Sequence, residues 1–231
     1  MTFKLFRGAK YNELAPELVQ TKELNFDTAD VWVDVSDKKV ILDTNNGIVN
    51  VDFNEYDDLL YAIVRVGRDL VFRDALDAMT RAINDLTYYM RHPYLQMSED
   101  LVDDLLNKIE KTKERLSKID YKLMIRIGQL SLKDVDNLIN SSPEVDKAVK
   151  GAIEQYRELC WKTYEDDDPD YCDKVSPIID AIVYVIPEEK SIVIVVDVDE
   201  IGEVYRVMNK YDNAYDFLKA VDEYYNKVID F

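Results

Sequence analysis

Residues 47–58 read GIVNVDFNEYDD, and residues 202–213 read GEVYRVMNKYDN. Both stretches start with glycine, carry valine two residues later and end in Asn-x-Tyr-Asp, a pattern of turn, strand and helix start. Each follows a predicted β-hairpin and precedes an amphipathic segment. The sequence therefore predicts two βββα units. The alternative is that the two stretches coincide by chance around common turn and cap residues.

The two predicted hairpins have similar patterns. The first joins residues 31–35 to 40–44 through a polar Ser-Asp-Lys-Lys turn, and the second joins 181–186 to 191–198 through Pro-Glu-Glu-Lys. Alternation and β-branched residues on both sides of turn formers are typical of hairpins. The second pair is almost continuously aliphatic, which favours central strands covered on both faces. We therefore expect both units to share one mostly antiparallel sheet.

A long helix is predicted after the first unit, because charges of alternating sign recur every four residues from Arg65 to Asp85. Pro93 ends this helix, and Ser98 begins a second one whose apolar seam has alternating three- and four-residue spacing. The seam consists of Val102, Leu105, Ile109, Thr112, Leu116, Ile119 and Leu123. The short connection predicts an antiparallel helical hairpin. Alternatively, the seam pairs two chains, which would give a homodimer or a self-assembling structural protein.

The expected fold class is α+β, with the helical hairpin inserted between the two βββα units. Residues 1–54 and 174–231 are expected to form the β-rich region with a C-terminal helix. Residues 55–164 are expected to be helical, and 165–173 to form an acidic surface loop. We expect these parts to make one compact domain.

Composition narrows the function mainly by exclusion. The chain has 231 residues, with 29 Lys and Arg against 47 Asp and Glu, a formal net charge of −18 and 47 % hydrophobic residues. That much apolar content argues against general disorder. Six glycines and the single His92 offer neither a phosphate-binding loop nor the usual histidine-based catalysis. The N-terminus lacks a signal-like stretch and the aliphatic runs are too short to span a bilayer, so we expect a soluble, cytoplasmic protein.

The negative charge is concentrated in residues 151–200, which hold 14 acidic and 4 basic residues. Such a field repels nucleic acid and anionic membranes and attracts basic proteins. The leading prediction is therefore a non-enzymatic acidic interaction protein. We expect it to mimic nucleic acid and to inhibit or regulate a nucleic-acid-binding enzyme, as viral or mobile-element anti-defence proteins do. The predicted contact residues are Glu165, Asp166, Asp167, Asp168, Asp170, Asp173, Asp197, Asp199 and Glu200.

The alternative is a hydrolase or nuclease that uses a divalent metal. Asp197 and Asp199 follow an aliphatic strand, and carboxylates are the ligands that Mg²⁺ or Mn²⁺ prefers. Asp34 or Asp43 of the other hairpin would complete a two-metal site. No cofactor is expected under the leading prediction.

Two cysteines, Cys160 and Cys172, flank the acidic run. Their spacing does not match a zinc site, so they are either free thiols or a single disulfide.

Overall fold

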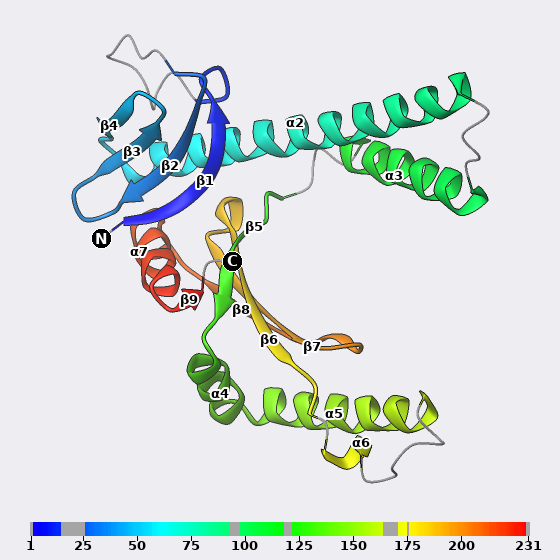
Figure 1. The fold of residues 1–231 in the computed structure, drawn as a ribbon. Coiled ribbons are helices and arrows are strands. Elements are labelled where there is room, and N and C mark those ends of the chain that lie inside the picture. Colours follow the sequence, from blue (N-terminus) through cyan, green and yellow to red (C-terminus); the bar gives the residue numbers. More distant parts are fainter. Residues whose placement is uncertain are drawn as a thin grey trace.

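The computed structural model describes residues 2–14, 26–92, 98–117, 122–163, 171–174 and 176–229. It confirms the α+β class and contains two antiparallel sheets (Figure 1). The first sheet is a four-stranded meander in the order β1-β2-β3-β4. Its strands are β1 (Thr2–Lys10), β2 (Thr28–Asp34), β3 (Lys39–Thr44) and β4 (Gly47–Asp52).

The second sheet has the order β8-β7-β6-β5-β9. Its strands are β5 (Ile125–Leu130), β6 (Ile179–Ile186), β7 (Ser191–Val198), β8 (Gly202–Lys210) and β9 (Val228–Ile229). β5 lies inside residues 55–164, which we expected to be helical. The sequence did not predict this strand because it is short and flanked by helices. The turn between β6 and β7 is a 3₁₀ helix, Pro187–Glu189, closed by Lys190 in the left-handed conformation.

The expectation of one shared sheet is wrong, because the strands form two separate sheets. The two edges that face each other are irregular. β1 shifts register against β2 at Leu5 and again between Phe6 and Ala9, and β5 shifts against β6 at Ile127. A β-bulge bends its strand and interrupts the ladder, so these edges cannot continue one into the other. The short β9 covers part of the β5 edge instead.

Both sheets have the predicted order of elements. β2-β3-β4 leads into helix α2 (Tyr56–Arg91), and β6-β7-β8 leads into helix α7 (Ala214–Tyr225). The likeness extends one strand further than predicted, because β1 and β5 occupy the same place as the first strand of each meander. In β1 and in β5, a glycine of positive φ lies at the register shift. Its φ is 60° at Gly8 and 155° at Gly128.

The main hydrophobic core is common to both sheets. It joins the inner faces of β1–β3 to those of β5–β7, with α2 and α7 between them (Figure 1). Phe3, Phe217 and Leu218 are among its largest fully buried side chains. A smaller core forms where α5 (Pro143–Thr163) packs Val145 and Val149 against Val196 of β7. The packing of apolar faces thus holds together two sheets that share no ladder.

The predicted helical hairpin is present as an arm (Figure 1). α2 runs under the first sheet and continues beyond it, where α3 (Glu99–Ser117) packs along it. Leu105 and Thr112 of the predicted seam are buried in this contact. Ile119 lies outside the described residues. Leu123, beyond the end of α3, packs against Gly67.

At the other end of the molecule, α4 (Leu132–Ser141) leads into α5, followed by the short α6 (Tyr171–Lys174).

Two helical glycines provide a matched test of this packing. A Cβ on Gly151 of α5 would meet open space, whereas one on Gly67 of α2 would overlap the buried Leu123 side chain. We expect Gly151→Ala to raise the free energy of unfolding by about 1 kcal/mol. Gly67→Ala should raise it by less than Gly151→Ala or lower it, because the shift required of the buried Leu123 side chain offsets the same gain in helix propensity. Urea unfolding of both variants checks this, and an equal gain in both would show that Leu123 does not pack on Gly67.

Asp222 of α7 gives a prediction about pH. It is 7 % exposed, and its Oδ1 has no hydrogen-bond partner among the described residues. Burial, together with the charges of Asp34 and Glu223, raises the pKa of Asp222. A raised pKa penalises the folded state once the pH exceeds the ordinary Asp range. Asp222→Asn should therefore stabilise the protein by about 1 kcal/mol at pH 7, with the gain shrinking towards pH 4.

Melting curves of Asp222→Asn and of Asp212→Asn, an exposed control, check this prediction. A gain that does not depend on pH would contradict it.

Candidate interaction face

Three carboxylates lie side by side at one end of the second sheet. Asp197 of β7 is directly opposite Asp180 of β6 on one side and Glu203 of β8 on the other. Residues that are cross-strand partners project from the same face, and like charges in such positions destabilise a sheet. Repulsion among the three carboxylates therefore lowers the stability of this end of the second sheet.

Neighbouring polar groups relieve part of this repulsion. Both side-chain nitrogens of Arg206 that face Glu203 donate to its carboxylate, at 3.0 Å from Nε and 2.8 Å from Nη2. These hydrogen bonds lower the pKa of Glu203. Gln129 donates to Asp180. Asp197 is half-buried, and its side chain has no hydrogen-bonding or ionic partner within the described part of the chain.

Asp199 and Glu200 continue the acidic surface into the β7–β8 turn, where both are exposed. The Asp199 backbone N–H donates to the Ile178 carbonyl at 2.9 Å, which fixes the start of the turn. Glu200 has a φ of 64°, in the left-handed region. We call Asp180, Asp197, Asp199, Glu200 and Glu203 the acidic face. Three of its members were predicted from the sequence, and strand register adds Asp180 and Glu203.

The other predicted contact residues follow α5. Glu165, Asp166, Asp167, Asp168 and Asp170 lie outside the described residues. Asp173 is in α6, and its side chain is not among those described. The question of the cysteines is resolved: Cys160 of α5 and Cys172 of α6 form a disulfide with a Cα–Cα distance of 5.7 Å. This bridge ties α6 to α5.

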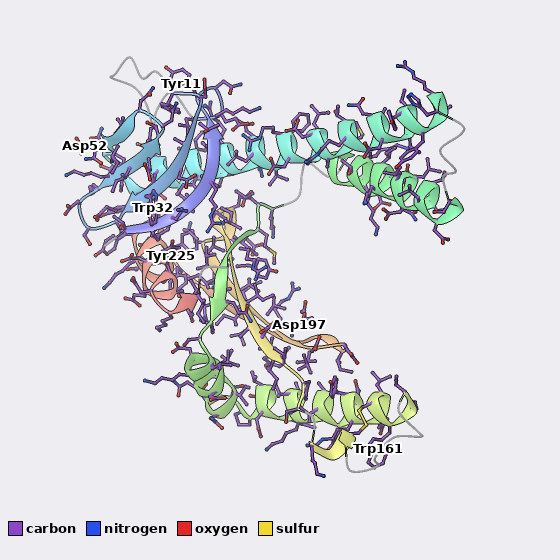
Figure 2. All side chains as sticks on the ribbon, in the orientation of Figure 1. Tyr11, Trp32, Asp52, Trp161, Asp197 and Tyr225 are labelled. Atoms are coloured by element: carbon purple, nitrogen blue, oxygen red, sulfur yellow. A yellow bond between two sulfur atoms is a disulfide. The ribbon has the colours of Figure 1, made fainter. Side chains whose placement is uncertain are left out.

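An exposed tryptophan adjoins the disulfide. Trp161 is 52 % exposed, and Leu159 next to the bridge is 41 % exposed. α5 packs on β7 and β8 through its N-terminal half, and Figure 2 shows Trp161 near the other end of α5, well apart from Asp197. Partly exposed tryptophan beside charged residues is typical of protein interfaces. Sequence analysis missed Trp161, since a tryptophan in a helix is more often a core residue than a surface one.

Within the described parts of the chain, the structure brings no third ligand to the predicted metal pair. Asp34 and Asp43 belong to the first sheet and do not join Asp197 and Asp199. Among the described residues, no group of three His, Cys, Asp or Glu side chains is placed to hold a metal ion. The same part of the chain contains no helix that is both long and apolar enough to cross a membrane.

Comparisons with protein-family models, with curated proteins and with solved structures find no match to this chain. The functional argument therefore depends on the geometry alone.

The disulfide should contribute measurably to stability. It closes a loop with a sequence separation of 12 residues, and a loop of about that size stabilises the folded state by roughly 3 kcal/mol. We expect reductant, or Cys160→Ser with Cys172→Ser, to lower the melting temperature by several degrees. The double variant is the control, because reductant should not affect it further. A wild-type melt unchanged by reductant would contradict the prediction.

Proposed function

We propose that this protein is a non-enzymatic, acidic interaction protein that binds a basic protein surface. The partner is a nucleic-acid-binding enzyme, and the surface that is bound is its basic nucleic-acid-binding cleft. Binding at this cleft inhibits or regulates the enzyme. The acidic face and the exposed Trp161 make the contact, and the acidic run next to the disulfide adds to it.

The observation that carries this proposal is the row Asp180–Asp197–Glu203. These carboxylates lie in adjacent strands and repel one another in the free protein. A cationic partner removes that repulsion when it binds, so part of the cost in the free chain becomes affinity in the complex. Trp161, near the C-terminal end of α5, supplies a separate apolar contact and stacks favourably on arginine or lysine.

The net charge of −18 adds a long-range electrostatic attraction to a basic partner. A field of this sign speeds the encounter with a basic surface, and salt screens it within about 10 Å at 0.1 M. Binding is therefore expected to compete with duplex DNA for the same surface and to weaken steeply as salt rises.

Pairing of two chains through the helical hairpin is not part of this proposal. Leu105 and Thr112 of the predicted seam are already buried within one chain, so they need no second copy to cover them.

The test uses a panel of basic DNA-binding enzymes, with affinity measured from 50 to 200 mM salt. We expect at least one to bind with steep salt dependence and to be released by duplex DNA. Asp197→Asn with Asp199→Asn and Glu200→Gln should weaken that complex at least tenfold, mainly through slower association.

The matched control removes the same charge from the arm, with Asp103→Asn, Asp104→Asn and Glu110→Gln on α3, and should bind as the wild type does. The proposal fails if binding is insensitive to salt, or if both triple variants lose affinity equally.

A further inference from the structure

A pocket lies where the two sheets meet edge to edge. Its volume is about 270 Å³. β1 contributes Lys4, Leu5 and Arg7 to its wall, and β5 contributes Arg126, Ile127 and Gly128. Tyr225 of α7 and Ile229 of β9 complete the lining. The first strands of the two meanders thus face each other across this space.

The pocket is basic in a strongly acidic protein. Lys4, Arg7 and Arg126 all line it, although the chain as a whole carries −18. Among the described residues, the Asp30 carboxylate adjoins them and accepts hydrogen bonds from Lys4 Nζ at 3.1 Å and from the Gly8 N–H at 2.9 Å. Asp30 offsets the charge of Lys4, so among the described groups of the lining Arg126 supplies an excess of positive charge. Arg126 is exposed, and its side chain makes no hydrogen bond or ion pair with any described residue.

β-Bulges in β1 and β5 set the directions of the side chains that line the pocket. The register shifts of β1 fall at Leu5 and at Arg7–Gly8, and that of β5 falls at Ile127, so both bulges are in the pocket wall. β-Bulges redirect side chains and are over-represented beside binding sites. Asp30 holds the second bulge of β1 through its bond to Gly8, whose φ is 60°.

The apolar part of the wall is well fixed. The Tyr225 ring packs against Phe3 at 6.2 Å and against Trp32 at 6.5 Å between centroids, and Figure 2 shows it on α7 close to Trp32. Lys4 Nζ lies 4.8 Å from the centre of the Trp32 ring. Leu5 and Ile127 are buried. The pocket therefore offers charged groups beside a rigid aromatic and aliphatic surface.

We propose that this pocket binds a small phosphate monoester with an aromatic or apolar body. A monoester carries about −1.5 to −2 charges at pH 7, and Lys4 and Arg126 in the lining attract it. Arginine suits phosphate because its planar fork donates two parallel hydrogen bonds. The space left by the phosphate faces Tyr225, Leu5 and Ile127. The site is separate from the acidic face, so this inference does not depend on the proposed function.

The experiment is calorimetric titration of the full chain with phenyl phosphate, in a buffer free of phosphate and at low salt. Benzoate, phenol and inorganic phosphate serve as comparison ligands. We expect saturable one-to-one binding of phenyl phosphate, at least tenfold weaker binding of benzoate and of inorganic phosphate, and none of phenol. These arms separate the contribution of the phosphate from that of the aromatic body.

Two variants locate the site. Arg126→Ala should weaken phenyl phosphate at least tenfold without shifting the melting temperature, because Arg126 is exposed. Ile229→Trp, at a residue 47 % exposed, should block the pocket without removing any charge. The control is Arg206→Ala, which removes an exposed arginine of the same sheet outside the pocket.

Three outcomes would overturn the inference. They are no saturable binding of phenyl phosphate, wild-type affinity for it in Arg126→Ala or in Ile229→Trp, or benzoate binding as tightly as phenyl phosphate.

Discussion

The structure depends on the irregular edges of β1 and β5. The bulges at Leu5, Arg7–Gly8 and Ile127 prevent these first strands from joining into one ladder, so the two meanders must meet through their apolar faces instead. α7 and α2 fill the space between them and complete a common core. If the edges were regular, nine strands could form one sheet, and neither the junction nor its pocket would exist.

This arrangement separates charges of opposite sign. The junction between the sheets collects Lys4, Arg7 and Arg126, whereas the far end of β6–β8 collects Asp180, Asp197 and Glu203. Like charges raise one another's electrostatic free energy in both places. Neither cluster is neutralised by the other, since the common core lies between the elements that carry them. Each therefore favours a ligand of the opposite charge.

Sequence patterns predicted the regular elements well and their assembly less well. Alternation and four-residue charge spacing located β2–β4, β6–β8 and the α2–α3 arm, because each depends on local periodicity. The separation of the sheets depends on bulges, whose only local sign is a glycine such as Gly8 or Gly128. β5 was missed because it is short and lies between helices. The acidic face was found in part, since Asp180 and Glu203 join it only through strand register.

The basic lining of the pocket shows that overall composition does not determine the local charge of a surface. A net charge of −18 argues against anionic ligands at long range, where all charges act together. At contact distance the few nearest groups dominate, because Coulomb energy falls with separation and solvent screens the rest. Lys4 and Arg126 are far apart in the sequence and meet only because the two first strands face each other. A local site of the minority charge is thus a consequence of topology, and no count of residues reveals it.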